Sequence, residues 1–335
     1  MSTQTSIHDI FHSFAKLKVL VIGDAMLDHY VFGDVLRISS EAPIPIVDVQ
    51  KYENRLGGAA NVALNVQALG AKVFLASVFG DDSNGHVLKE VLSSNQINST
   101  ACILNQERRT TVKTRVVSRN QQIVRYDYED GSPINEQTEL ALLDNVIDII
   151  YNETPDVVIL QDYNKGVLTP KVIANVIHNC TQNGIPVAVD PKHDNFWAYK
   201  GCTLFKPNRE EAMSGLDMSI SANRPETLMV ADNQIRSVLK NQYTIITLSD
   251  KGIFVGAEDD HELVPAYYRK INDVSGAGDT VISLLALGLA LNLDIFATAE
   301  LANIAAGLVC EQVGVSPIDI NDLIKEATLL FGDGE

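Results

Sequence analysis

Short apolar runs alternate along the chain with longer segments of helical periodicity. The apolar runs predict buried strands at 18–22, 72–78, 157–160, 186–189, 202–205 and 243–248. Helical patterns lie between most of these runs and beyond them, at 57–69, 137–151, 170–183, 229–239, 281–293 and 320–330. Strands that alternate with helices form βαβ units, so the pattern predicts an α/β fold with a mostly parallel sheet.

Two segments, 30–50 and 111–128, break this alternation. Both resemble strands with alternating side chains, and neither has a helix between its halves. In the second segment, a polar turn at 118–121 separates two such halves, which is typical of a β-hairpin. We expect both segments to form a small β-sheet lid beside the main sheet. No repeat or linker indicates a second domain, so residues 1–335 are predicted to form one domain.

The composition is that of an ordinary globular protein, with 46% hydrophobic and 21% charged residues. The formal net charge of −17 would repel a phosphate backbone, so we expect no nucleic-acid partner. The sequence opens on no signal-peptide pattern and contains no apolar run long enough to span a membrane, so we expect no membrane association. The four cysteines are far apart and include no C-x-x-C pair, which argues against a zinc site or a disulfide framework and favours a cytoplasmic location.

A run of small residues at Gly276, Ala277 and Gly278 precedes Asp279 and an apolar helical segment. Small residues let the backbone approach a ligand, and free N–H groups at a helix start favour an anion. Phosphoryl transfer needs such a cradle, together with a carboxylate that positions or deprotonates the attacking hydroxyl. Asp279 stands where it could do both. The alternative is a glycine-rich loop in which Asp279 complements the helix dipole, and the motif alone does not decide between them.

A second motif pairs Gly57 and Gly58 with Asn61, one helical turn further on. Paired glycines would let a polyol lie against the backbone, and an asparagine side chain can both donate to and accept from sugar hydroxyls. Plain helix–sheet packing by small residues is the alternative, and for this motif alone it is favoured.

The two motifs, in this order and at this spacing, resemble the two signatures of the PfkB (ribokinase-like) carbohydrate kinases. The second signature departs slightly, because Leu284 stands where many members have a small residue. The resemblance covers nearly the whole chain and implies a ribokinase-like three-layer α/β/α sandwich with a β-sheet lid. It also implies a carbohydrate kinase that uses ATP and Mg²⁺, with Asp279 as catalytic base and residues 276–278 as anion hole.

Further positions match this family. Asp28, after the first strand, matches a sugar-binding aspartate, whereas Asp24 is expected to be a turn residue. Residues 208–211 resemble the N-x-x-E element, which organises the nucleotide phosphates and Mg²⁺, and Glu211 would contact the ion through water. An ordinary helix N-cap by Asn208 is the alternative there. The resemblance therefore implies this nucleotide-binding set: Asn208, Arg209, Glu210, Glu211, Ser249 and Gly252 near the phosphates, and Asn303 and Gly307 near the adenine.

Segments 37–45 and 115–125, with 162–166 and 190–192, are similar to D-glycero-β-D-manno-heptose 7-phosphate kinases. Such kinases phosphorylate the anomeric hydroxyl to give the 1,7-bisphosphate, on the route to ADP-heptose and lipopolysaccharide. A substrate that carries a phosphate needs basic residues around it. The candidates are Arg37, Arg119, Arg125, Lys165 and Lys192, with Asn120 and Gln121 for the sugar hydroxyls. The alternatives are that the basic residues are ordinary solvated charges of the lid, and that Asn120 and Gln121 simply form the hairpin turn.

The acceptor could instead be ribose, fructose or a fructose phosphate, and a non-catalytic sugar-binding regulator on the same fold is the alternative outside enzymes. In many bacteria the heptose kinase is fused to a nucleotidyltransferase domain. This chain ends at Glu335, so we expect no such domain and a separate protein for that step. Lids of this kind often pair between subunits in the family, so a homodimer through the lid is expected.

Overall fold

The computed structural model describes residues 6–119, 121–258, 260–267 and 269–332. In this part of the chain, eight strands form the central sheet, in the order β14-β13-β12-β11-β10-β9-β1-β4. Neighbouring strands from β12 to β4 are parallel, whereas β13 is antiparallel to both of its neighbours, β12 and β14. Their bounds are β1 (Lys18–Gly23), β4 (Lys72–Ala76), β9 (Val157–Gln161), β10 (Val187–Asp190), β11 (Leu204–Phe205), β12 (Tyr243–Thr247), β13 (Ile253–Ala257) and β14 (Asp260–Val264).

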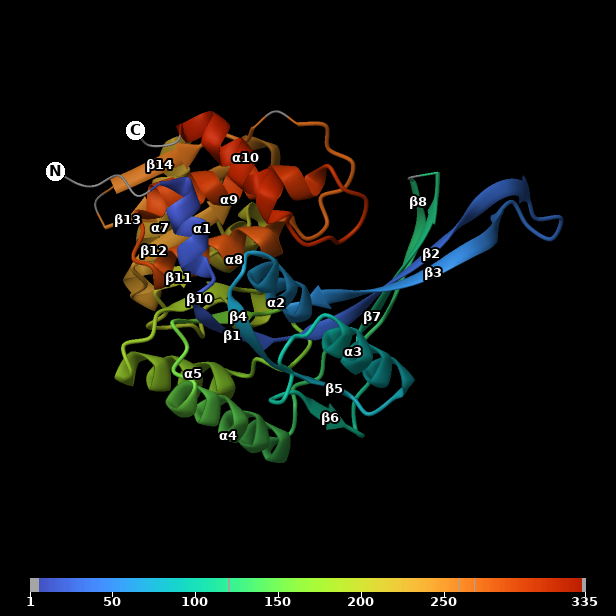
Figure 1. Cartoon of the computed structure of the whole chain (residues 1–335), viewed down its shortest axis with the longest axis horizontal. Coiled ribbons are helices and arrows are strands. Elements are labelled where there is room, and N and C mark those ends of the chain that lie inside the picture. The colour runs from blue at the N-terminus through green and yellow to red at the C-terminus, as the bar shows by residue number, and fades with distance from the viewer. Residues whose placement is uncertain (1–5, 120, 259, 268, 333–335) are drawn as a thin grey trace.

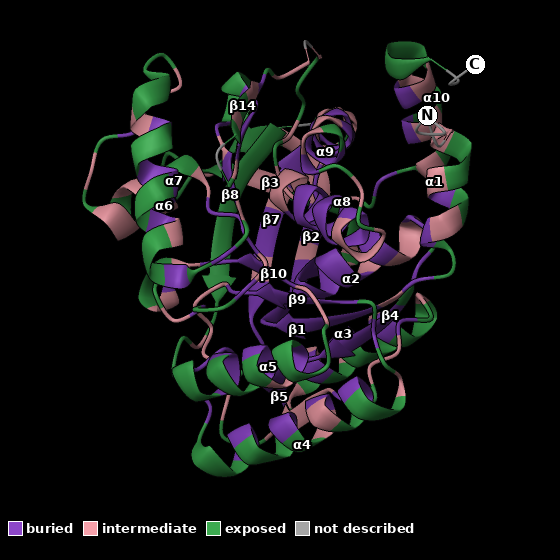
Figure 2. Cartoon of the chain, turned by 90° about the vertical axis from the view of Figure 1, so that its left-hand side faces the viewer, coloured by how far each residue is buried: buried purple, intermediate pink, exposed green. Residues whose placement is uncertain are grey.

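Helices cover both faces of this sheet, and Figure 2 shows the two layers. One layer contains α1 (Ile7–Phe14), α2 (Ala59–Ala68), α8 (Ala277–Ala290), α9 (Ile295–Cys310) and α10 (Ile320–Phe331). The other contains α4 (Glu136–Asn152), α5 (Pro170–Gln182), α6 (Arg209–Leu216) and α7 (Pro225–Leu239). Strand β1 shows why both layers form. Val19 and Val21 pack into the first layer, Leu20 and Ile22 into the second, because successive side chains of a strand point to opposite faces.

A second sheet, which we call the lid, has the order β3-β2-β7-β8 and projects from the sandwich (Figure 1). Its strands are β2 (Ala25–Ile38), β3 (Pro45–Gly58), β7 (Val112–Ser118) and β8 (Gln121–Tyr128). The β2–β3 and β7–β8 pairs are antiparallel, and β2 and β7 are parallel. A short parallel pair, β5 (Val78–Gly80) and β6 (Ile103–Asn105), lies with α3 (Ser83–Ser94) near the base of the lid.

The α/β fold and the mostly parallel sheet are confirmed, and so is the hairpin at 118–121. The bounds of several elements differ from expectation. The strand expected at 72–78 ends at Ala76, because the hydroxyl of Ser77 bonds to the backbone of Gly23 and Ala25 instead. The lid strands β2 and β3 are longer than expected. Helix α8 begins at Ala277 rather than Val281, so the glycine-rich motif forms its first turn.

None of the helices in the described ranges combines the length and the apolar sequence that a membrane crossing requires.

Candidate active site

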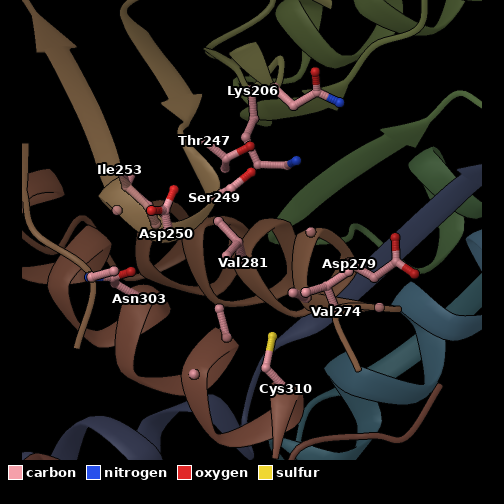
Figure 3. A pocket seen from close by; sticks show the side chains of 18 of the residues that line it. Lys206, Thr247, Ser249, Asp250, Ile253, Val274, Asp279, Val281, Asn303 and Cys310 are labelled. Atoms are coloured by element: carbon pink, nitrogen blue, oxygen red, sulfur yellow. The ribbon is translucent and has the colours of Figure 1, made fainter. Parts of the chain in front are cut away.

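A cavity of about 410 Å³ opens at the carboxyl ends of the central strands, beside the start of α8 (Figure 3). Asp190 ends β10, Lys206 follows β11 and Thr247 ends β12, and all three line this cavity. Parallel strands present their carboxyl ends at the same edge of a sheet, which is where α/β proteins place their ligands. The cavity is therefore the principal candidate for a binding site.

The start of α8 forms one wall of the cavity and presents backbone N–H groups to it. Gly276 is the N-cap residue, with a φ of 85° that favours glycine. The N–H of Ala277 makes only a 3.4 Å contact with the Val274 carbonyl, and Thr280 is bonded back to Gly276 at 3.0 Å. Helix starts leave their first N–H groups without intrahelical partners and carry about half a positive charge. Residues 276–278 therefore line the cavity at a helix start, and their role as an anion hole stays a prediction.

Asp279 lies in the first turn of α8 and is only 5% exposed. One of its carboxylate oxygens accepts a hydrogen bond from Asn61 Nδ2 at 2.6 Å, and the other accepts one from the Tyr163 hydroxyl at 2.8 Å. Burial raises the pKa of Asp279 to about 6, although the donors Asn61 and Tyr163 favour its charged form. A carboxylate with such a pKa is ionised at neutral pH and close to the range suited to general-base catalysis.

A buried ion pair stands beside Asp279. The ammonium group of Lys206 lies 3.0 Å from Asp190 Oδ2, and Gln161 Nε2 donates to the same oxygen at 3.0 Å. A Cβ atom on Gly278 would stand 3.7 Å from Lys206 Nζ, so this cation lies next to the predicted anion cradle. Sequence reasoning missed Lys206 and Gln161, because neither belongs to a motif and only the order of the strands brings them to Asp279.

Lys192 lies on the same cavity wall, where its ammonium group contacts Glu211 and stands over the ring of Tyr163, 5.4 Å from the centroid. Burial would lower the pKa of Lys192, but the carboxylates of Asp190 and Glu211 outweigh it and raise the pKa. Lys192 is thus positively charged. It was predicted to bind the substrate together with residues of the lid, but it lies among the residues predicted to bind the nucleotide.

The N-x-x-E element forms a capping box at the start of α6. Asn208 Oδ1 accepts from the N–H of Glu211 at 2.9 Å, and Glu211 Oε2 accepts from the N–H of Asn208 at 2.8 Å. The helix-capping alternative is therefore present, and both side chains still line the cavity. Arg209 and Glu210 are exposed and are not among the residues of the cavity wall.

The cavity wall also contains the apolar residues Ile253, Val281, Ala306 and Cys310, which would suit a flat aromatic base. The predicted residues Ser249, Gly252, Asn303 and Gly307 also line the cavity. Gly252 has a φ of 92°, and a Cβ atom there would stand 1.9 Å from the Val264 carbonyl oxygen, so the turn requires glycine. Asn303 donates to the Pro265 carbonyl at 2.7 Å.

The predicted sugar-binding residues gather on the other side of Asp279. A Cβ atom on Gly57 would stand 2.4 Å from Asp28 Oδ2, and one on Gly58 would stand 2.3 Å from the Asp24 carbonyl oxygen. Both glycines therefore permit close backbone contacts that a side chain would block. Asp28 is buried and forms an ion pair with Arg115. Burial raises the pKa of Asp28, against the opposing effect of this arginine.

Asp24 has a larger role than that of a turn residue. Its buried carboxylate accepts the backbone N–H groups of Tyr163 at 2.8 Å, Lys165 at 3.1 Å and Val167 at 3.1 Å. Burial raises the pKa of Asp24 to about 6. Asp24 thus holds the 163–167 loop, which in turn brings the Tyr163 hydroxyl to Asp279.

The remaining predicted residues lie on the lid. Arg37, Gln121 and Arg125 are exposed, and Arg119 is exposed in the hairpin turn with a φ of 47°. None of these four is part of the cavity wall. Asn120 lies outside the described residues. Lys165 belongs to the body and forms an ion pair at 3.0 Å with Glu129, the residue that follows the last lid strand.

Known proteins are similar to the chain over most of its length. The sequence profile described as pfkB family carbohydrate kinase matches residues 16–321. The bifunctional protein HldE of Trichlorobacter lovleyi is 40% identical over 332 residues, which cover 98% of this chain and 66% of that protein. The chain thus spans about two thirds of the length of such curated relatives.

Solved structures show the same fold. Phosphofructokinase-2 from Escherichia coli in complex with potassium superposes with a TM-score of 0.78 at 18% identity, over 94% of this chain and 99% of that chain. Arabidopsis thaliana ribokinase complexed with ribose and ATP gives a TM-score of 0.70 at 16% identity, over 92% of this chain and 99% of the other. At such identities the likeness concerns the fold, which is ribokinase-like.

Proposed function

The chain belongs to the pfkB family of carbohydrate kinases, and we propose that it transfers the γ-phosphoryl group of ATP to the anomeric hydroxyl of D-glycero-β-D-manno-heptose 7-phosphate. The observation that carries the proposal is the placement of Asp279. This carboxylate is buried between Asn61 and Tyr163, at the junction of the cavity and the glycines of the second motif.

In the proposed reaction, Asp279 accepts the proton of the sugar hydroxyl as the hydroxyl oxygen attacks the γ-phosphorus. A new O–P bond forms, the bond between the γ-phosphorus and the bridging oxygen breaks, and ADP leaves. The N–H groups at the start of α8 and the ammonium group of Lys206 stabilise the charge of the transferred group. Closure of the lid would exclude water and so limit hydrolysis of ATP.

ATP serves kinases as its Mg²⁺ complex, and the donors in the cavity fit that ion. The carboxylates of Asp190 and Glu211 line the cavity, and Mg²⁺ prefers oxygen ligands while keeping several waters. Both oxygens of Glu211 already have protein partners, Asn208 and Lys192. We therefore propose that Glu211 meets the ion through water. When bound, the ion neutralises phosphate charge.

The choice of a heptose 7-phosphate rests on the sequence resemblance of the lid and of segments 162–166 and 190–192. The 40% identity with the bifunctional protein HldE over nearly the whole chain supports it. The solved phosphofructokinase-2 and ribokinase structures share only 16 to 18% of the sequence. Ribose, fructose and fructose phosphates remain the alternative acceptors, and a regulator without catalysis remains the alternative outside enzymes.

The experiment is an assay of the purified protein with Mg·ATP and the heptose 7-phosphate, with ADP release and the product followed by phosphorus NMR. Ribose, fructose and fructose 6-phosphate are assayed in parallel. The proposal expects a 1,7-bisphosphate, with ribose and fructose inert. If another sugar is phosphorylated and the heptose phosphate is not, that sugar is the substrate instead. If no sugar causes release of ADP, the result favours a non-catalytic regulator.

We also propose that the lid pairs two copies of the chain in the cytoplasm. The lid strands and the β2–β3 turn expose several large apolar side chains, whose burial against a second copy would be favourable: Leu36, Ile38, Ile44, Tyr52 and Tyr126. Light scattering coupled to size-exclusion chromatography should report a dimer, and Leu36→Asp with Ile44→Asp should give a monomer. A monomeric parent protein would contradict this proposal.

A further inference from the structure

A cluster of charged side chains joins the lid to the 163–167 loop, outside the cavity described above. Lys113 Nζ lies 3.0 Å from Asp127 Oδ2 and 3.5 Å from Glu129 Oε2. Lys165 Nζ lies 3.0 Å from Glu129 Oε1, so two lysines share one carboxylate. Arg125 contacts both oxygens of Asp127, at 3.1 and 3.2 Å.

The strand register places this cluster on the same face of the lid as the predicted sugar-binding aspartate. Asp28 of β2 stands opposite Lys113 of β7, and Lys113 stands opposite Asp127 of β8. Residues directly opposite on neighbouring strands project to the same face, and so do alternate residues along one strand. Asp28 and its partner Arg115 therefore share a face with Lys113 and Asp127. Lys165 approaches this face from the body.

The cluster is also linked to Asp279 through the 163–167 loop. Lys165 is two residues from Tyr163, whose hydroxyl bonds to Asp279, and Asp24 holds the N–H groups of both residues. Two residues span at most about 7 Å of backbone. Lys165 therefore lies on the same short loop as the residue that bonds to Asp279.

The two lysines are more buried than the acid that they share. The side chains of Lys113 and Lys165 are 17% and 16% exposed, and that of Glu129 is 36% exposed. Hydrogen bonds and charge from both lysines hold the pKa of Glu129 below its usual value in spite of partial burial. Glu129 is thus an anion that approaches two ammonium groups from the solvent side. A phosphate group carries more charge than a carboxylate and has three acceptor oxygens.

We propose that Lys113 and Lys165 bind the phosphate group of the phosphorylated sugar, and that Glu129 occupies this position until the phosphate displaces it. This inference rests on the proposed function, because it requires an acceptor that carries a phosphate. It selects Lys165 from the candidates that the sequence offered and adds Lys113, which belonged to no motif. Arg125 and its partner Asp127 flank the site.

The test uses the full chain and the variants Lys113→Met and Lys165→Met, with the heptose 7-phosphate and the unphosphorylated heptose as acceptors. Charge-assisted hydrogen bonds are strong, so each variant should raise the KM for the phosphorylated sugar about tenfold to a hundredfold. The KM for ATP and the turnover of the unphosphorylated heptose should not change. Inorganic phosphate should inhibit the parent protein competitively with the sugar phosphate, and the variants less.

Lys171→Met is the matched control, because Lys171 also contacts two carboxylates, Glu136 at 3.1 Å and Glu139 at 3.5 Å, but lies on α5. It should leave every constant as it is. An unchanged KM for the sugar phosphate in both cluster variants, or an equal loss with both sugars, would overturn the inference while the proposed function stands. A parent protein that accepts only unphosphorylated sugars would overturn both. A preference for another sugar phosphate would change the named substrate. The two variants should then raise the KM for that sugar phosphate, and an unchanged KM would overturn the inference.

Discussion

The hydrogen bond from Tyr163 to Asp279 makes a prediction about the pH dependence of the reaction. In the structure, the phenol donates to the carboxylate at 2.8 Å and thereby favours its charged form. Tyr163→Phe removes this donor and keeps the ring under Lys192. The charged form of Asp279 then loses stabilisation, so its pKa should rise from the value of about 6.

The size of the shift follows from the strength of the bond. A hydrogen bond to a charged group contributes about 1.5 to 3 kcal/mol, and one pKa unit corresponds to about 1.4 kcal/mol, so the pKa should rise by about one to two units. With a pKa of about 6, Asp279 is about 90% ionised at pH 7. In the variant this fraction falls to between about 50% and about 10%.

The assay is the pH profile of kcat/KM, which reports the groups of the free enzyme. The parent profile should rise through a limb near pH 6, and the Tyr163→Phe limb should lie about one to two units higher. Activity at pH 7 should fall about twofold to ninefold and recover at high pH. Tyr199→Phe is the matched control, because that buried hydroxyl donates to Asp162 at 2.6 Å rather than to Asp279. A lower kcat/KM at every pH, with the limb unmoved, would refute this role of Tyr163.

Three further predictions follow from the same geometry. Asp279→Asn should lower kcat by about 10²- to 10⁴-fold, while the affinity for ATP, measured by calorimetry, should not change. Full activity of this variant would show that Asp279 is not the base. The pKa of Asp279 is raised from 3.8 to about 6, so the folded state binds its proton more tightly, and this contribution to stability, present below pH 4, is lost as the pH rises through 6. The free energy of unfolding, measured with urea, should therefore change differently in Asp279→Asn between pH 4 and pH 8. Over this range the variant should gain about 3 kcal/mol relative to the parent, and an equal change in both proteins would contradict the raised pKa. Gly57→Ala would place a Cβ atom 2.4 Å from Asp28 Oδ2. It should therefore raise the KM for the sugar at least tenfold and leave the KM for ATP unchanged. Equal changes in both constants would indicate misfolding instead.

The sequence by itself predicted the parts of this protein that depend on neighbours along the chain. Apolar periodicity located most strands and helices, because the two faces of a covered sheet demand continuous apolar strands. The predicted anion cradle and Asp279 lie within four consecutive residues, and their conformation is that of a helix start. Family resemblance then supplied their expected roles.

Only the tertiary structure decided which groups surround Asp279. Tyr163 and Asn61 are 116 and 218 positions away in the sequence, and Lys206 reaches the same place from the end of another strand. The order of the strands brings these ends together, and that order is not written in any local pattern. The same holds for the basic residues, since Lys192 lies in the cavity wall and Arg119 in an exposed turn of the lid. The charge of a side chain can be read from the sequence, but the pKa and the partner of that side chain depend on burial and contacts that only folding creates.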